Sequence, residues 1–193
     1  MNIPAFLAYV FISAFTPGPN NIMAMTNSIK YGLLKALVFC LGVLFGCLID
    51  MTLCAMATSF LFEYIPVIEP GMRWVGAIYI AYLAVVVYRD KGGEEKTLST
   101  PSGFFTGIVM QLVNVKLIFY GITALTTFVL PFHQSWGALT LAVLFLSVLG
   151  FFGTVCWALF GSLFQRCHAK HRGGLNAVMA LLLVYCAVGI VMQ

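Results

Sequence analysis

Two ionisable residues, Asp50 and Lys116, each interrupt a long apolar segment of this sequence. A charged side chain at the centre of a bilayer costs at least about 2.5–3.5 kcal/mol on insertion scales, so such a residue is a candidate for function. A lysine at that depth can bind an anionic group, and an aspartate can carry a proton or pair with the lysine. We therefore predict that Lys116 binds substrate and that Asp50 is a proton-coupling candidate. A purely structural ion pair between them is the alternative.

The first apolar segment contains a second feature, the run Pro17-Gly18-Pro19-Asn20-Asn21. Two prolines remove two amide donors and disfavour helix at the residues before them. A broken helix at membrane depth is tolerated only where protein or a wet cavity satisfies the exposed backbone groups. The two asparagines can cap the second half-helix, whose positive end can then point at an anion. We predict that all five residues belong to a substrate-binding site, and a simple proline kink is the alternative.

The fourth apolar segment holds two further polar residues, Gln111 and Asn114, close to Lys116. Lys116 lies about 13 residues, or roughly 20 Å, from the cytoplasmic end of its segment, which is too deep for the amine to reach the interface easily. Asp50 lies about 14 residues into the second segment and therefore at nearly the same depth. Gln111 and Asn114 are predicted to complete the polar contacts of the substrate.

The composition places these residues in a membrane protein. Ten Lys and Arg and six Asp and Glu make up only 8% of the 193 residues, and 62% of the residues are hydrophobic. A soluble domain carries roughly 25% charged residues. This chain has too few polar residues to cover the surface of a soluble globule. The composition therefore excludes an ordinary soluble enzyme, a disordered chain and a nucleic-acid binder, and it predicts an all-α integral membrane protein.

Six apolar runs, each near or above the roughly 20 residues that a spanning helix needs, follow one another. Pro66 and Pro70 indicate a turn between the second run and the third. Gly42, Gly46 and Asp50 step by four, so Asp50 is predicted to face other helices rather than lipid. The six runs cover residues 5–27, 36–62, 70–88, 103–129, 136–164 and 174–192.

The positions of the basic residues predict the orientation. Eight of the ten Lys and Arg lie in segments 28–35, 89–102 and 165–173, whereas the alternate loops hold only Arg73. Cytoplasmic loops carry the excess of positive charge in membrane proteins. We therefore predict that these three segments lie in the cytoplasm and that both termini lie on the outer, periplasmic side.

The hydrophilic linker 89–102 divides the chain into two halves of three spans each, residues 1–88 and 103–193. An odd number of spans in each half means that related halves would be inverted in the membrane, as in many secondary transporters. We predict one polytopic domain, residues 1–193, built from two inverted three-helix repeats.

The run Thr16-Pro17-Gly18-Pro19-Asn20 in a broken first span resembles the signature of the LysE/RhtB family of amino-acid exporters. In that family Asn-Pro-Lys opens the second half, and Asn114-Val115-Lys116 matches two of its three positions. The stretches QLVNVKLIFYGITALTTFVLP (111–131) and LLLVYCAV (181–188) resemble the cysteine/O-acetylserine exporter branch, which also has valine inside this motif. The six-span length and the linker fit as well, so the resemblance covers the whole chain.

The resemblance implies a secondary transporter of the bacterial cytoplasmic (inner) membrane that exports small neutral amino acids such as cysteine and O-acetylserine. It implies antiport with protons and a homodimer, and it implies neither a cofactor nor enzymatic activity. In this reading Lys116 neutralises the substrate carboxylate. An acid at the position of Asp50 departs from the branch, where an apolar residue is expected, so a pair between Asp50 and Lys116 is expected to be particular to this chain.

Three other functions remain open from the sequence. The first is export of another amino acid, such as homoserine or threonine. The second is export of a divalent metal, which would need clusters of His or carboxylate at membrane depth, where Asp50 is the only acid. The third is electron relay through cysteine, which would need a paired dithiol, and none of the six cysteines forms a Cys-x-x-Cys pair.

Overall fold

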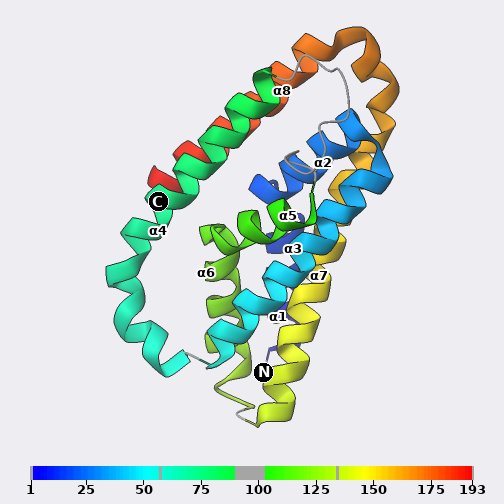
Figure 1. Ribbon diagram of the computed structural model, residues 1–193. Helices are drawn as coiled ribbons and strands as arrows, with labels where there is room; N and C mark the ends of the chain where they lie inside the picture. Colours follow the sequence, from blue (N-terminus) through cyan, green and yellow to red (C-terminus); the bar gives the residue numbers. More distant parts are fainter. Residues whose placement is uncertain (1, 57, 90–102, 134, 193) are drawn as a thin grey trace.

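The computed structural model describes residues 2–56, 58–89, 103–133 and 135–192, and within these ranges the regular structure is entirely helical (Figure 1). This agrees with the all-α class predicted from composition. The helices are α1 (Ile3–Phe15), α2 (Pro19–Tyr31), α3 (Leu33–Met56), α4 (Thr58–Arg89), α5 (Phe104–Leu112), α6 (Val115–Thr123), the π-helical turn η1 (Ala124–Val129), α7 (Trp136–Leu163) and α8 (Gln165–Met192).

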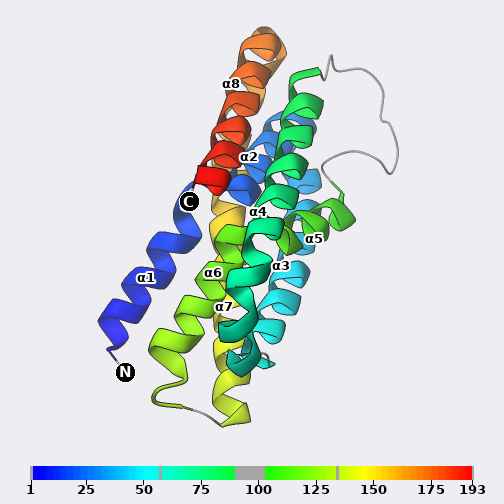
Figure 2. The same ribbon diagram turned by 90° about the vertical axis from the view of Figure 1, so that its left-hand side faces the viewer.

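Two long helices, α3 and α7, pack against each other and form the centre of the bundle. Each of them also lies along a pair of shorter helices, α3 along α5 and α6, and α7 along α1 and α2. The helices α4 and α8 pair with each other, and Figures 1 and 2 show them side by side in both views. The arrangement therefore places two interrupted helices, α1/α2 and α5/α6, on the two central ones.

The apolar core consists of two clusters. One is built mainly from α2, α4, α8 and the first half of α3, with one residue each from α5, α6 and α7. The other is built from α1, α6, η1, the second half of α3 and the first half of α7. In α3 the first cluster ends at Val43 and the second begins at Cys47. The breaks between α1 and α2 and between α5 and α6 fall between the two clusters, so polar groups at the breaks have apolar packing on either side.

Glycines allow the central helices to touch the interrupted ones at backbone distance. A Cβ at Gly42 of α3 would overlap the carbonyl oxygen of Phe104, and a Cβ at Gly107 of α5 would overlap that of Phe39. On the other side, a Cβ at Gly153 of α7 would lie 2.6 Å from the carbonyl oxygen of Ala14. Small residues at such contacts are typical of helix packing in membranes, where close approach provides the attraction.

The helix boundaries agree with the predicted apolar runs in part. The helices α3 and α7 are long and apolar enough to cross a membrane, and α5 with α6 and η1 forms a third candidate crossing that is bent by 63°. Shorter apolar helices lie in α1, in residues 74–89 of α4 and in residues 176–189 of α8. The described part of the chain thus supports two spans, or three with the bent pair, and the predicted count of six stays a prediction. The break in the first run, at residues 16–18, is confirmed.

Two predicted separators are wrong. The turn that Pro66 and Pro70 indicated between the second and third runs lies inside α4, which starts at Thr58. The whole of segment 165–173 lies inside α8, which starts at Gln165. Hydropathy marks where a chain is apolar, but a helix continues beyond the apolar core because its polar ends can lie in the interface. A proline inside a helix removes one hydrogen bond and bends the helix without always ending it.

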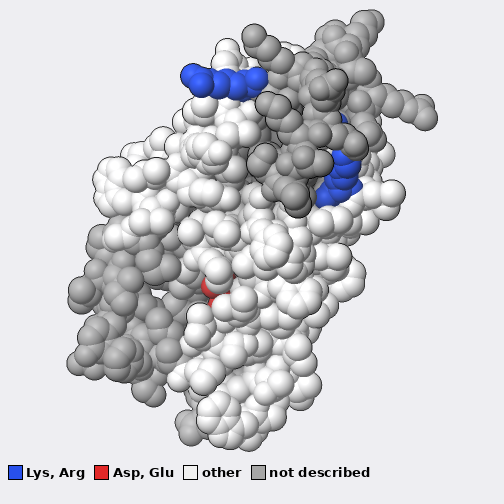
Figure 3. Space-filling model, in the orientation of Figure 1, with Lys and Arg blue, Asp and Glu red and all other residues white. Residues whose placement is uncertain are grey.

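The described basic residues of the predicted cytoplasmic segments lie at one end of the bundle. Lys30 lies in the last turn of α2, Lys35 in the first turn of α3, and Arg89 ends α4. These helix ends lie in the upper part of Figure 1. In the view of Figure 3 the Lys and Arg side chains are visible only in the upper half. The Lys30 amine donates to the carbonyl of Val87 at 2.8 Å, which ties α2 to α4 at this end. Most of the linker 89–102 lies outside the described residues.

We expect Gly42→Ala to destabilise the protein because its methyl group would meet the α5 backbone, which cannot move aside as a side chain can. Overpacking of this kind typically costs about 1–3 kcal/mol. A lower unfolding temperature in detergent would measure it. Gly189→Ala is the matched control, since no atom lies within 4 Å of the added Cβ in the described structure and alanine favours helix. Equal unfolding temperatures for the two variants would contradict the packing argument.

Candidate functional site

The first break leaves the last carbonyl groups of α1 without helical partners, and side chains from other helices satisfy them. The Asn21 amide nitrogen donates to the carbonyl oxygens of Ala14 at 3.1 Å and of Thr16 at 3.0 Å. The Trp157 indole of α7 donates to the carbonyl of Phe15 at 3.0 Å. An unsatisfied carbonyl in a bilayer costs several kcal/mol. These bonds therefore allow the helix to stop at membrane depth.

The second break, at Val113 and Asn114, separates α5 from α6. Lys116 lies just after it, and its amine donates to the carbonyl oxygen of Thr16 at 2.9 Å. The lysine therefore reaches from the second break to the first. A Cβ at Gly18 would lie only 3.2 Å from the Lys116 nitrogen, so glycine leaves room for the amine.

The two breaks are linked in both directions. Asn20 is the second residue of α2, and Lys116 is the second residue of α6. The Asn20 amide nitrogen donates at 2.6 Å to the side-chain oxygen of Gln111, near the end of α5. The Lys116 amine donates to Thr16 at the end of α1. In each broken span, a side chain of the second half-helix thus binds near the end of the first half-helix of the other span.

Asp50 is connected to these hydrogen bonds through Gln111. The Gln111 amide nitrogen donates to a carboxylate oxygen of Asp50 at 2.9 Å. Asp50 is only 6% exposed, which agrees with its prediction as an inward-facing residue of α3. Among the residues that the structure describes, Asp50 and Lys116 do not form the ion pair that the sequence suggested, because the lysine binds the Thr16 carbonyl instead.

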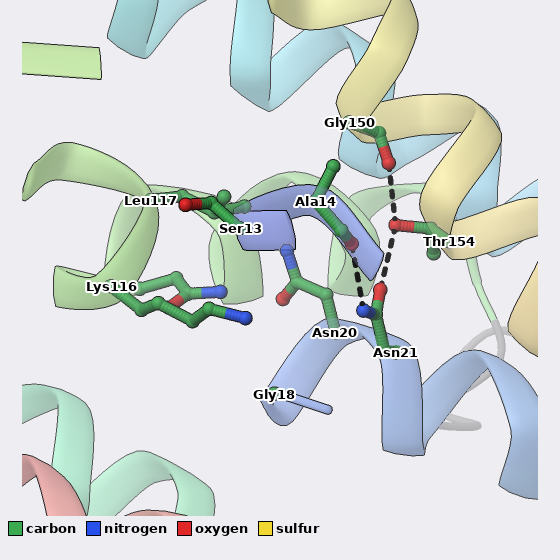
Figure 4. Close-up of a pocket in the computed structure, with 10 residues that line it drawn as sticks. Ser13, Ala14, Gly18, Asn20, Asn21, Lys116, Leu117, Gly150 and Thr154 are labelled. Carbon is green, nitrogen blue, oxygen red and sulfur yellow. Dashed lines mark hydrogen bonds between the residues drawn. The ribbon is translucent and has the colours of Figure 1, made fainter. Parts of the chain in front are cut away.

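A small cavity lies at the meeting point of the breaks (Figure 4). The space open to the centre of a water molecule there is about 10 Å³, enough for roughly one water. The side-chain oxygens of Asn20 and Asn114 are buried at this place with no hydrogen-bond partner in the described chain. The lining residues are Ser13, Ala14, Gly18, Asn20, Asn21, Asn114, Lys116, Leu117, Gly150 and Thr154.

Sequence reasoning named half of this lining. Gly18, Asn20, Asn21, Asn114 and Lys116 all reach the cavity. Pro17 and Pro19 form the break beside it, whereas Gln111 and Asp50 lie behind it, joined to it through Asn20.

Thr154 is a site residue that the sequence analysis missed. Its hydroxyl lies 3.2 Å from the Asn21 side-chain oxygen and 3.0 Å from the carbonyl of Gly150, so it fixes Asn21 against α7. Ser147 and Thr154 are spaced by seven in the mainly apolar helix α7, and both are buried. That spacing places them on one face and was the signal available in the sequence.

The cavity combines groups of opposite character. The Lys116 amine and the N-terminal ends of α2 and α6 favour a negative group. The unpartnered oxygens of Asn20 and Asn114 can accept hydrogen bonds from a positive group. Together these groups suit a small molecule that carries both an anionic and a cationic end.

Known proteins resemble this chain over nearly its whole length. A "Cysteine/O-acetylserine efflux protein" of Salmonella paratyphi A is 43% identical over 190 residues, which cover 98% of this chain and 97% of that protein. Proteins of the same name from Klebsiella pneumoniae and Escherichia coli K12 are 42% identical and cover 99% and 97% of this chain, and 97% and 96% of their own length.

No solved structure matches the chain. Residues 11–193 match the protein family described as LysE type translocator, a region that includes both breaks and the cavity between them. The chain therefore belongs to the LysE family of translocators, whose members, like the three relatives above, are transporters.

Proposed function

We propose that this protein is a secondary transporter of the bacterial inner membrane that exports small neutral amino acids, cysteine and O-acetylserine among them. The observation that carries the proposal is 42–43% identity, over nearly the full length, to proteins named for efflux of those two compounds. The cavity supports it, because a small amino acid is a zwitterion and the lining offers both a cation and hydrogen-bond acceptors. In this proposal the chain is not an enzyme and needs no cofactor.

The proposed architecture has six crossings in two inverted halves, α1 to α4 and α5 to α8. Each half begins with a broken helix and continues with a long apolar one, and each long helix packs on the broken helix of the other half. The end that carries Lys30, Lys35 and Arg89 would lie in the cytoplasm, following the excess of basic residues there. Both termini would then lie on the periplasmic side, and a homodimer in the bilayer is the proposed assembly.

The proposed binding step exchanges one hydrogen bond. In the described state the Lys116 amine binds the Thr16 carbonyl, and the cavity is far too small for an amino acid. A substrate carboxylate is a stronger partner for an ammonium group than a neutral carbonyl. When it replaces Thr16, one of the two links between the breaks is released and the site can widen, while the bond between Asn20 and Gln111 remains. Asn20, Asn21 and Asn114 would supply the remaining polar contacts, and Pro17, Gly18 and Pro19 would hold the backbone dipoles of the break in place.

The proposed coupling ion is the proton, carried by Asp50. Asp50 is buried, lies one hydrogen-bonded side chain away from a cavity residue, and is the only Asp or Glu whose side chain the structure describes. Antiport requires that proton and substrate favour different states of one site. The contact through Gln111 gives Asp50 a way to influence that site.

The function is tested by overproducing the protein and measuring amino acids in the medium. We expect cysteine and O-acetylserine to accumulate outside the cells and tolerance to both to rise. Threonine and homoserine serve as comparison compounds. Accumulation of those two alone would replace the proposed substrates, and no change in any amino acid would overturn the transport proposal.

Lys116→Met is expected to reduce export at least about ten-fold, because a charge-assisted hydrogen bond to the substrate carboxylate is lost. Lys116→Arg should also lose activity, because the guanidinium group is larger and planar and would meet the backbone at Gly18. The Lys116 amine already lies so close to Gly18 that a Cβ there would be only 3.2 Å from its nitrogen. Lys35→Met, in the exposed start of α3, is the control and should export normally. Normal export by the membrane-inserted Lys116→Met variant would exclude this role for the lysine.

Asp50→Asn should abolish accumulation driven by a proton gradient while leaving exchange of substrate for substrate. Inside-out vesicles with an acidic interior measure the first activity, and counterflow of labelled cysteine across vesicles without a gradient measures the second. Cys54→Ala, one helical turn away on the same face of α3, is the control. Gradient-driven accumulation by Asp50→Asn equal to that of the unchanged protein would remove Asp50 from coupling.

A further inference from the structure

A line of three buried side chains connects the cavity to Asp50. Asn20 lines the cavity, its amide nitrogen donates to the Gln111 oxygen at 2.6 Å, and the Gln111 nitrogen donates to Asp50 at 2.9 Å. Gln111 is fully buried, and both ends of its amide are bonded. Asp50 itself does not line the cavity. The hydrogen-bonded route from Asp50 to a ligand therefore passes through the Gln111 amide.

The orientation of the Gln111 amide depends on the charge of Asp50. An ionised carboxylate only accepts hydrogen bonds, so it binds the NH₂ end of the amide. The oxygen end then faces Asn20, which must present its own NH₂ group. This leaves the Asn20 oxygen directed toward Lys116, as Figure 4 shows, and without a partner in the described chain.

We propose that Gln111 is a positioning residue that turns its amide when Asp50 binds a proton, and so changes which atom Asn20 presents to the substrate. This inference rests on the proposed transport function and deepens its coupling step. A proton on the Asp50 oxygen that now accepts from Gln111 makes that oxygen a donor. The Gln111 oxygen then turns to accept from Asp50, its nitrogen donates to the Asn20 oxygen, and the Asn20 NH₂ group faces the cavity.

The turn fits the space available. It exchanges the oxygen and nitrogen of one amide by rotation about its last torsion, which has a broad two-fold preference. The two atoms are similar in size, so the rotation needs no new volume. The stem of Gln111 lies against Gly46, where an added Cβ would lie 2.7 Å from the Gln111 Cβ, so the stem stays in place while the amide turns.

The two states differ in affinity for a zwitterion. With Asp50 ionised, the site offers the Lys116 amine for a carboxylate and the Asn20 oxygen for an ammonium group. With Asp50 protonated, the site offers two donors side by side, and the substrate ammonium loses an acceptor and meets a donor. Protonation therefore weakens binding, which is the sign that export in exchange for a proton requires.

The other ionisable groups around Asp50 are thiols, a phenol and an amine, so the Asp50 carboxylate is the group that we expect to take up the proton. The thiols of Cys47 and Cys54 on α3 lie close enough to interact with it, and the phenol of Tyr120 on α6 interacts with Cys47. From α5 it faces the neutral Gln111 amide, and the Lys116 amine of α6 is bound to Thr16. Asp50 keeps 6% of its surface exposed and does not line the cavity.

The test measures binding of labelled L-cysteine, under reducing conditions, to the purified full-length protein across a pH series. We expect affinity to fall about ten-fold as Asp50 takes up a proton, since one charged hydrogen bond is lost. Gln111→Met keeps the length of the side chain and removes both amide atoms, so its affinity should no longer depend on pH. Met110→Leu, the buried neighbour on α5, is the matched control and should behave as the unchanged protein.

Infrared difference spectra between high and low pH, recorded without ligand, test the turn itself. The unchanged protein should show a carboxylic-acid band that Asp50→Asn lacks, together with side-chain amide bands that Gln111→Met lacks. A carboxylic-acid band without any amide change would overturn the proposal, even if Gln111→Met did not fold. Unaltered pH dependence of binding in a folded Gln111→Met would overturn it as well. Absence of cysteine binding to the unchanged protein would instead contradict the proposed function, and the spectra would still decide the turn.

Discussion

The cost of an unsatisfied backbone carbonyl in hydrocarbon is the constraint on which this structure depends. The end of α1 exposes the carbonyls of Ala14, Phe15 and Thr16, and the donors that satisfy them come from α2, α7 and α6. One broken helix thus requires three other helices to lie close to it. The site is therefore a consequence of the break, because the groups that satisfy the carbonyls are also the groups that surround the cavity.

Close packing is what lets these donors reach. A hydrogen bond needs about 2.7–3.2 Å between its heavy atoms, so α3 and α7 must approach the interrupted helices at backbone distance. Gly42 and Gly107 provide that approach on one side, and Gly153 provides it on the other. The same glycine face of α3 also carries Gly46 and Asp50, so the packing surface and the polar network are one feature of the helix.

Sequence reasoning reached the parts of the fold and site that follow from local chemistry. Two prolines around Gly18 predict the first break, and the depth of Lys116 marks it as a binding residue before any contact is known. The second break was not predicted, because no proline marks it. The partner of Lys116 could not be predicted either, because every residue has a backbone carbonyl and the sequence does not distinguish that of Thr16. The acidic side chain of Asp50 is specific in the sequence, so Asp50 was predicted as the partner instead. Trp157 was missed because an indole in an apolar segment reads as packing.

The two broken spans carry different polar residues at the second position of their second half-helices. The second residue after each break is Asn20 in the first span and Lys116 in the second. Two lysines there would repel each other across the cavity, and two asparagines would leave no charge for a carboxylate. One of each, in the proposed function, makes the site complementary to a zwitterion. The amide, unlike the ammonium group, can present either a donor or an acceptor, and it is the amide side that is connected to the acid at Asp50.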